Sequence, residues 1–282
     1  MTTTHEISKF PRVNLWAEKL DAFHADAEQL LTKTMRAYHR SNVLLNPKRW
    51  KKVRSRDNLH VYRDRSVSNA YAPEMVCVGT MPGRLEDVLE GLNCETTREF
   101  CMMQAIISSR FLDGAVLKVI QRRSHDEPYS FTGIKWFAMH VPGGGLISNR
   151  DLCVFEKVGL VYDPDTKRRL GFKLFHSVDI PECPTLHGFV RMKANVCYVL
   201  EEIEPTVLGV YLTGSFDWNG SSMLSRVANP TIAYYLLRVG ETSKCLRARK
   251  FTERSRSFKG PKSKKRMSVV GVVKWSGCWL LN

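Results

Sequence analysis

The stretch NRDLCVFEKVGLVYDPDTKRRLGFKLFHS, residues 149–177, decides the fold of this chain. Apolar and polar residues alternate in its two halves, and the turn-favouring sequence DPD at residues 163–165 separates them. This pattern predicts two antiparallel strands with one apolar face. The same face carries Glu156 and His176, two residue types that a plain core rarely contains without partners. We therefore predict that the hairpin forms one wall of an internal cavity.

The hairpin belongs to a longer series of alternating segments. Strands are predicted over Ala115–Gln121, Ser130–His140, Arg150–Tyr162, Arg169–Ile180, Phe189–Ile203 and Thr206–Phe216. Short loops join these segments, so strands that follow one another in the chain are expected to pair antiparallel. A sheet of this kind has to cover its apolar face, and the helical pattern of Ser221–Val239 is the candidate cover.

The first part of the chain predicts helices and a few short strands. Apolar residues recur at steps of three and four in the amphipathic segment Trp16–Arg40, which predicts a helix packed on the domain. Short strands are expected over Trp50–Val53, Leu59–Arg63 and Met75–Met81, and helices over Arg84–Leu92 and Thr96–Arg110. Thr96 and Glu99 fit a capping box at the start of the second of these helices. Together with the sheet, these elements predict the α+β class.

The positive charge of the chain is concentrated near its C-terminus. The net charge is +15, and residues 244–266 hold eleven Lys or Arg against one acid, Glu253. The basic character therefore belongs to a tail and says little about the folded body. We divide the chain into an N-terminal extension over residues 1–15, one domain over residues 16–243 and a basic, disordered tail over residues 244–282.

The composition also excludes several classes of protein. No run of about 18 apolar residues occurs, so no membrane span is predicted, and the start MTTTHEISKFPRVN has no apolar core of a secretory signal. The eight cysteines form no C-x-x-C pair, so we expect reduced thiols in a cytoplasmic protein and no metal site. We expect no cofactor, and we expect a monomer.

Alternation assigns one residue in two of each strand to the inside of the sheet. The inward set is Ile134, Trp136, Ala138, His140, Leu152, Val154, Glu156, Val158, Leu160, Leu170, Phe172, Leu174, His176, Val178, Val190, Met192, Ala194, Val196, Tyr198 and Leu200. Lys135 and Lys173 then fall outside, which favours this choice. Large and small residues alternate along the strands, which fits either an interdigitated core or a hollow. Glu156 and His176 are expected to bond to each other, to a ligand or to a buried water.

Several motifs also occur in a recognisable order. They are RLEDVLEGL at residues 84–92, NRDL at 149–152, FVR at 189–191 and TGSFDWNG at 213–220. This set resembles the START family, the steroidogenic-acute-regulatory-related lipid transfer domains. Longer segments, such as EDVLEGLNCETTREF and GIKWFAMHVPG, are similar to START-like proteins of oomycetes, many of which carry a FYVE zinc finger after the domain. The resemblance extends from about Ala17 to Glu241.

The resemblance implies a helix-grip fold, in which a curved antiparallel sheet wraps a C-terminal helix and encloses a tunnel for one lipid, such as a sterol or phospholipid. It also implies that the loop over residues 141–149 and the last helix form a gate. The candidate cavity residues are Trp136, Ala138, His140, Leu152, Val154, Glu156, Phe172, Leu174, His176, Met192, Ala194, Val196, Tyr198, Met223 and Val227. The candidate gate residues are Gly143, Gly144, Gly145, Arg150 and Asp151, although the three glycines fit an ordinary hairpin loop equally well.

The chain departs from the family in two places. Cholesterol-binding members have a buried Glu–Arg pair, and the equivalent positions here are Phe137 and Glu156, so the pair is absent and one charge is inverted. This departure argues against specificity for a sterol. No C-x-x-C pairs follow Glu241, so the zinc finger of the similar oomycete proteins is missing.

The leading hypothesis is a non-catalytic lipid-binding or lipid-transfer module with a mostly apolar cavity. Transfer would involve transient contact with an anionic membrane surface, which the basic tail would favour. The first alternative is an enzyme of the cyclase or hydrolase type, with Glu156 and His176 or His140 as a general acid/base pair. The second is a polyanion-binding protein that uses the tail. Nucleic acid is the least favoured polyanion, because Phe251 and Phe258 are the only aromatic residues between residues 244 and 266.

Overall fold

One antiparallel sheet of ten strands organises the residues that the computed structural model describes, which are 9–40, 46–68, 72–143, 145–163, 166–220, 225–242 and 244. The strands are β1 (Trp50–Arg56), β2 (Leu59–Asp64), β3 (Glu74–Pro82), β4 (Phe111–Gln121), β5 (Phe131–Met139), β6 (Asn149–Tyr162), β7 (Arg169–Ser177), β8 (Phe189–Arg191), β9 (Lys193–Glu204) and β10 (Val207–Asp217). Their order is β1-β2-β3-β10-β9-β7-β6-β5-β4. The short strand β8 lies off this path and pairs with β6 in parallel.

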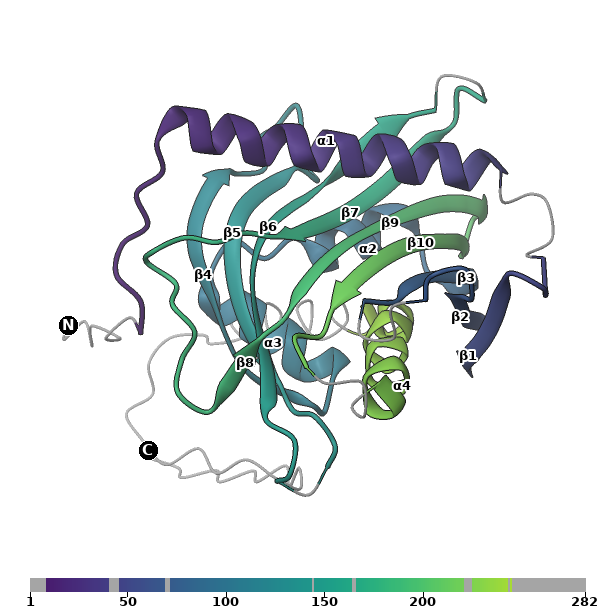
Figure 1. Cartoon of the computed structure of the whole chain (residues 1–282). Coiled ribbons are helices and arrows are strands. Elements are labelled where there is room, and N and C mark those ends of the chain that lie inside the picture. The colour runs from purple at the N-terminus through teal and green to yellow at the C-terminus, as the bar shows by residue number, and fades with distance from the viewer. Residues whose placement is uncertain are drawn as a thin grey trace, which may run out of the picture. The chain divides into compact units, whose positions relative to one another are not determined.

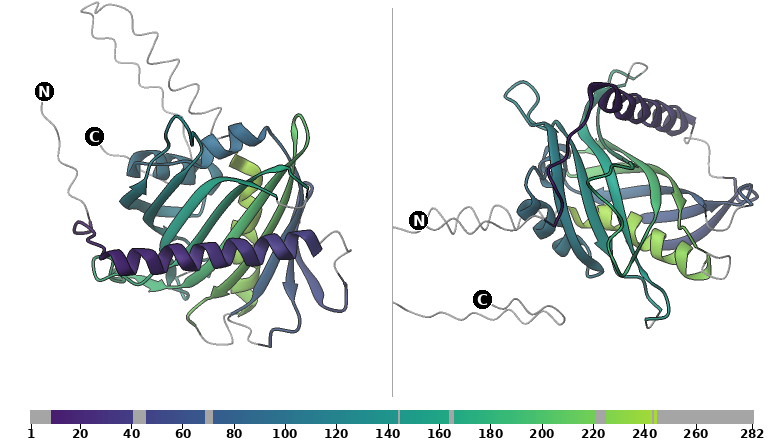
Figure 2. Two further views of the ribbon diagram at one scale, coloured as in Figure 1. Left: turned by 90° about the horizontal axis from the view of Figure 1, so that it is seen from above. Right: turned by 60° about the vertical axis from the view of Figure 1, so that its left-hand side comes forward.

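Four helices pack on this sheet. They are α1 (Ala17–Arg40), α2 (Leu85–Leu92), α3 (Thr97–Ile107) and α4 (Ser225–Leu236), and a 3₁₀ helix, η2 (Leu237–Glu241), continues α4. The strands curve, α1 lies across their outer face, and α2, α3 and α4 lie on the inner side (Figure 1). The views in Figure 2 show the same arrangement, with α1 alone on its side of the sheet. The chain divides into two units, and every element named here belongs to the first, residues 1–247.

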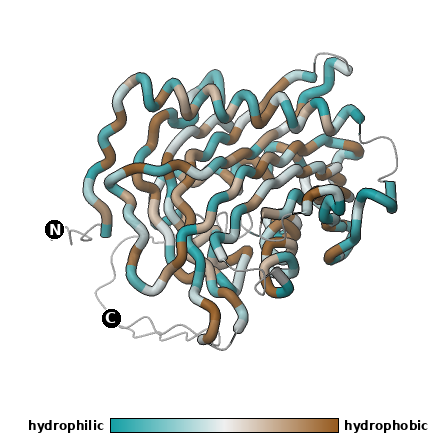
Figure 3. Tube along the Cα trace, viewed as in Figure 1, coloured by the Kyte–Doolittle hydropathy of each residue, from teal (hydrophilic) through white to brown (hydrophobic). Residues whose placement is uncertain are grey.

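Local sequence explains where these helices begin. Thr96 accepts a hydrogen bond from the Glu99 amide, and the Glu99 carboxylate accepts one from the Thr96 amide, so the predicted capping box is confirmed. The long helix α1 buries Phe23, Ala27 and Thr34 on one side and leaves charged residues on the other. Apolar and hydrophilic segments alternate along it in Figure 3, as the period of a half-buried helix requires.

Both faces of the sheet are buried, which the sequence did not reveal. The inner face belongs to the largest apolar cluster, with Leu152 and Val154 from β6 and Val196 from β9. The outer face packs against α1 and the segment before it, where the rings of Phe10 and Trp136 lie 5.1 Å apart. Phe10 and Val13, which the sequence analysis placed in an extension, are buried in this outer cluster.

The predicted faces are therefore correct for two strands and wrong for two others. The inward residues of β6 and β9 belong to the inner cluster, as expected. In β7, however, the predicted inward residues Phe172 and Leu174 lie in the outer cluster, and in β5 the same is true of Trp136 and Ala138. The assignment failed because it placed the lysines of these two strands in solvent, whereas both lysines are buried on the inner side.

The two edges of the sheet differ in how they are protected. Strand β4 forms one edge and contacts α3, which packs beside it. Strand β1 forms the other edge, and its sequence WKKVRSR carries four cations, of which Lys51, Lys52 and Arg54 are exposed and Arg56 is half-buried. Positive side chains on an edge strand oppose pairing with a strand of another molecule.

Candidate ligand cavity

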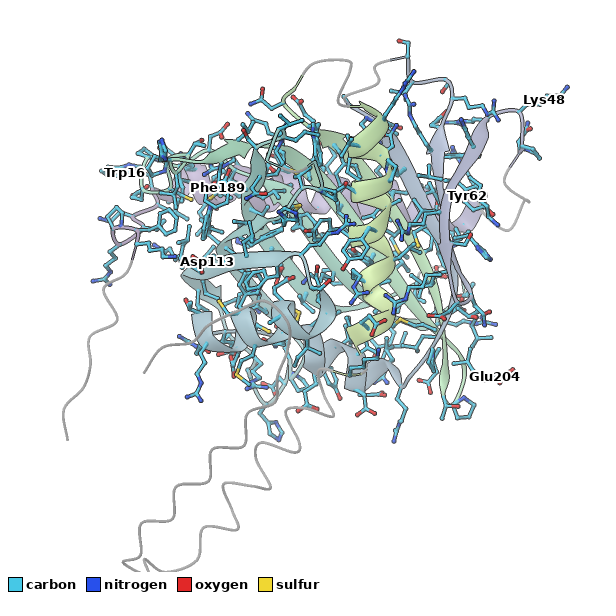
Figure 4. All side chains as sticks on the ribbon, turned by 90° about the horizontal axis from the view of Figure 1, so that it is seen from below. Trp16, Lys48, Tyr62, Asp113, Phe189 and Glu204 are labelled. Atoms are coloured by element: carbon cyan, nitrogen blue, oxygen red, sulfur yellow. The ribbon has the colours of Figure 1, made fainter. Side chains whose placement is uncertain are left out.

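A cavity of about 110 Å³ lies between the inner face of the sheet, α3 and the α4–η2 segment. In Figure 4, which views the molecule from below, α4 crosses in front of the strands. The cavity is lined by Leu92, Met103, Gln104, Ile107, Ser108, Phe137, Met139, Leu152, Lys173, Phe175, Met192, Ala194, Tyr198, Phe216, Trp218, Ile232, Tyr235, Leu236, Arg238, Val239 and Thr242. Most of these side chains are apolar or aromatic, and a few polar groups are placed among them, as in sites that bind small apolar ligands.

A buried ionic cluster supports one wall of the cavity. Glu156 accepts a hydrogen bond from the Lys135 ammonium and forms a second ion pair with Lys173, at 3.0 Å. The three residues are 0–7% exposed. Lys135 also lies over the ring of Phe131, at 4.1 Å from its centroid. Burial alone would raise the pKa of Glu156, but the two lysines outweigh it and hold this pKa below its usual value.

The register of the strands explains how this cluster forms. Lys135 of β5 pairs with Val154, and Lys173 of β7 pairs with Val158, so each lysine lies diagonally next to Glu156 on the same face of β6. Long side chains reach such diagonal neighbours. Lys135 and Lys173 on either side of an inward Glu156 could have been found from the sequence, but only with the pairing of three strands already known.

Tyr198 and Trp218 add hydrogen-bond donors to the cavity wall. Tyr198 of β9 pairs directly with Lys173 of β7, so its side chain and the lysine are neighbours on the inner face. Burial raises the pKa of Tyr198, so the phenol keeps its proton at neutral pH. The indole nitrogen of Trp218 is buried and has no hydrogen-bond partner within the described part of the chain. The cavity therefore offers more donors than the protein itself satisfies.

The Arg150-Asp151 pair at the start of β6 is divided between the two faces of the sheet. Arg150 donates to the carbonyl oxygens of Trp218, at 3.1 Å, and Ser148, at 2.6 Å, and its guanidinium lies 4.9 Å from the Trp218 ring centroid. Burial lowers the pKa of Arg150. Asp151 points to the outer side, where it accepts hydrogen bonds from Trp136 at 2.8 Å and from Arg191. This pair anchors the end of the predicted gate loop to both layers of the molecule.

The described part of that loop is exposed. It joins β5 to β6, and Leu146 within it is 94% exposed. Gly145 has a φ angle of +85°, a conformation that favours glycine. Gly143 is also described, whereas Gly144 lies outside the described residues.

The structure brings some of the predicted cavity residues together and separates others. Leu152, Met192, Ala194 and Tyr198 line the cavity. Val154, Glu156, Val196 and Val227 lie on the inner side without lining it. The predicted residues on the outer side are Trp136, Ala138, Phe172, Leu174 and His176. His140 is exposed at the end of β5, and Met223 lies outside the described residues.

The expected contact between Glu156 and His176 does not form. His176 bonds to the carbonyl oxygen of Phe23 in α1, at 3.0 Å, on the outer side of the sheet. Burial lowers the pKa of His176, which favours the neutral ring at this position. Sequence reasoning missed Phe137, Met139 and Phe175 as inner residues, because it reversed the faces of β5 and β7.

Solved structures with the same architecture are START domains. Human StAR-related lipid transfer protein 5 matches with a TM-score of 0.58 and 17% identity, over 79% of this chain and 97% of that chain. Human STARD10 matches with a TM-score of 0.55 and 14% identity, over 79% of this chain and 82% of that chain. The chain has the START fold. No model of a known protein family and no curated protein matches the sequence.

The START fold was therefore predicted correctly from the sequence, as a helix-grip arrangement of a curved sheet around a C-terminal helix. Phe137 and Glu156, the positions at which the family resemblance implies a buried Glu–Arg pair, both lie on the inner side. None of the described helices is long and apolar enough to cross a membrane.

Proposed function

We propose that this chain is a non-catalytic lipid-binding or lipid-transfer module that holds one hydrophobic ligand between the sheet and α4. The observation that carries the proposal is the apolar cavity lined by Met192, Phe216 and Ile232, with few polar groups among them. The shared fold supports it, because two of the similar structures are described as lipid transfer proteins or domains.

Ligand entry requires the cavity to widen. Its volume of about 110 Å³ is below the roughly 300–1,000 Å³ of pockets that enclose larger ligands. The exposed loop between β5 and β6 and the helix α4 are the proposed moving parts, since they border the cavity without belonging to the sheet. Moving and reordering such segments involves a free-energy difference on the order of a few kcal/mol.

The contacts of the two candidate histidines argue against the enzymatic alternative. The carboxylate of Glu156 is held by two lysines, His176 lies on the opposite face, and His140 is exposed next to Asn149. The acid/base pair that would support a cyclase or hydrolase reaction therefore does not assemble in this arrangement.

The proposal places the protein in the cytoplasm as a monomer that contacts anionic membranes transiently. The basic tail, residues 244–266, would favour that contact by about 1 kcal/mol for each Lys or Arg near the lipid surface. All of the tail except Lys244 lies outside the described residues, so its role follows from its composition.

The test is the lipid content and transfer activity of the purified chain. Native mass spectrometry and lipidomics should identify a co-purified lipid, and transfer between liposomes should follow for that class. Ala194→Trp fills the cavity wall and should abolish both readouts. Ala25→Phe, on the exposed side of α1, is the matched control. Absence of any bound lipid together with no transfer of any lipid class would overturn the proposal.

A further inference from the structure

The charged side chains that line the cavity, within the described residues, are Lys173 and Arg238, and both are cations. No acidic residue of the described chain is among the lining residues. A cavity that selected an uncharged ligand would have no need of this bias, because a buried charge without compensation is unfavourable. The sign of the lining charge therefore contains information about the ligand.

The cluster behind Lys173 does not cancel its charge. Lys135 and Lys173 each form an ion pair with Glu156, and neither pairs with a second carboxylate of the described chain. Two ammonium groups against one carboxylate leave a net charge of +1 in a region that is almost fully buried. Since Lys135 is completely buried and also stacked on Phe131, Lys173 is the lysine that the cavity exposes to a ligand.

Arg238 shows the same imbalance at another part of the wall. Its guanidinium lies 3.9 Å from Glu241, but Glu241 also pairs with Arg56 and Lys244. One carboxylate is thus shared among three cations. The unsatisfied indole N–H of Trp218 is a further donor in the wall.

We propose that the ligand is an anionic amphiphile with a single chain, whose carboxylate or phosphate monoester group is bound by Lys173 and Tyr198. This inference rests on the proposed function. Lys173 and Tyr198 are direct cross-strand neighbours, so one acid group can accept from the ammonium and the phenol together. The small cavity favours one chain over two, because one chain requires less widening.

Three ligands with the same chain test the headgroup. Binding of oleic acid, oleyl alcohol and 1-oleoyl lysophosphatidic acid to the delipidated full chain is measured by isothermal titration calorimetry. One charge-assisted hydrogen bond predicts that the acid or the phosphate binds about ten- to a hundredfold more tightly than the alcohol. The acid and phosphate arms distinguish the two sources of negative charge.

Substitutions test whether Lys173 is the binding group. Lys173→Met keeps the Lys135–Glu156 pair and should reduce the preference for the charged ligand to less than about threefold, with the affinity for the alcohol retained. Lys173→Arg should preserve the preference. Lys157→Met removes a charge from the opposite face of β6 and is the matched control, with no expected change. Thermal denaturation checks that each variant is folded.

Each outcome bears on one of the two proposals. Equal affinities for the alcohol and the charged ligands overturn the inference but leave the proposed function intact. A preference that survives in Lys173→Met removes Lys173 from the headgroup site. No binding of any of the three ligands counts against the proposed function itself. If Lys173→Met does not fold, the comparison of the three ligands on the wild-type chain still decides the ligand class.

Discussion

The inner and outer faces of the sheet are both buried, but they satisfy their polar groups differently. On the outer face, the ring of Phe155 lies 5.3 Å from that of His176, and His176 bonds to α1. Asp151 is bonded by Trp136 and Arg191 on the same side. The inner face instead surrounds a cavity with an excess of positive charge and an unsatisfied indole. The outer face is completed by the chain itself, whereas we propose that a ligand completes the inner one.

The largest expected effect would come from the outer face. Phe155→Ala should lower the free energy of unfolding by about 3–5 kcal/mol, because it removes a fully buried ring beneath α1. Urea denaturation followed by circular dichroism measures the change. Ligand affinity per folded molecule should stay the same, and a loss of affinity equal to that of cavity variants would show that the two faces do not act separately.

A smaller loss of stability is expected on the inner face. Glu156→Gln leaves two buried lysines without a carboxylate, and it should lower the free energy of unfolding by about 3 kcal/mol at pH 7. The amide retains a hydrogen bond to one lysine, so the loss lies at the lower end of the range for a broken buried pair. The same urea experiment at pH 7 tests this value, and an unchanged midpoint would mean that Glu156 is not an important partner of the lysines.

The pH dependence of stability gives a sharper reading of the same variant. The folded pKa of Glu156 is held below its unfolded value, so its contribution is complete above that unfolded value, about 4.3. The contribution is lost as the pH falls from there through the folded pKa. Glu156→Gln should therefore differ most from wild type at neutral pH, and the difference should shrink below about pH 4. A difference that is constant with pH would contradict the assignment.

The smallest expected effect concerns the attachment of α1. The Thr34 hydroxyl lies 2.7 Å from that of Thr213 in β10 and also bonds to the Leu30 carbonyl oxygen. Thr34→Val should lower the free energy of unfolding by about 1 kcal/mol, since it leaves the Thr213 hydroxyl without this partner. Thermal denaturation detects the shift, and Thr32→Val on the exposed side of α1 is the control. Equal shifts in both variants would point to helix propensity rather than to this contact.

The sequence was sufficient for the order of the elements and for two of the strands that face the cavity. Alternation placed Leu152 of β6 and Met192 of β9 correctly, because the opposite faces of those strands did not mislead it. It failed for β5 and β7, where Lys135 and Lys173 were assumed to contact water. A lysine is a sound indicator of an exposed face only where no buried acid is within its reach.

The separation of Glu156 from His176 has a related cause. Both residues lie in strands with apolar residues on both faces, so the hydrophobic pattern alone does not fix which face is the inner one. The helix α1, which covers the second face, was predicted, but its position against the sheet depends on contacts between distant parts of the chain. The long-range pairing of strands therefore had to be known before the cavity residues could be assigned.

The basic edge strand β1 has a consequence for encounters between molecules. Two copies that approached each other along this edge would bring Lys51, Lys52 and Arg54 of each close together, and the repulsion would oppose their association. The same charges attract a surface of opposite sign at any orientation that presents the strand. Salt weakens both effects within a distance of about 8–10 Å at physiological concentrations. Ionic strength thus acts in opposite directions on the two encounters: it makes self-association easier and adsorption to an anionic bilayer weaker.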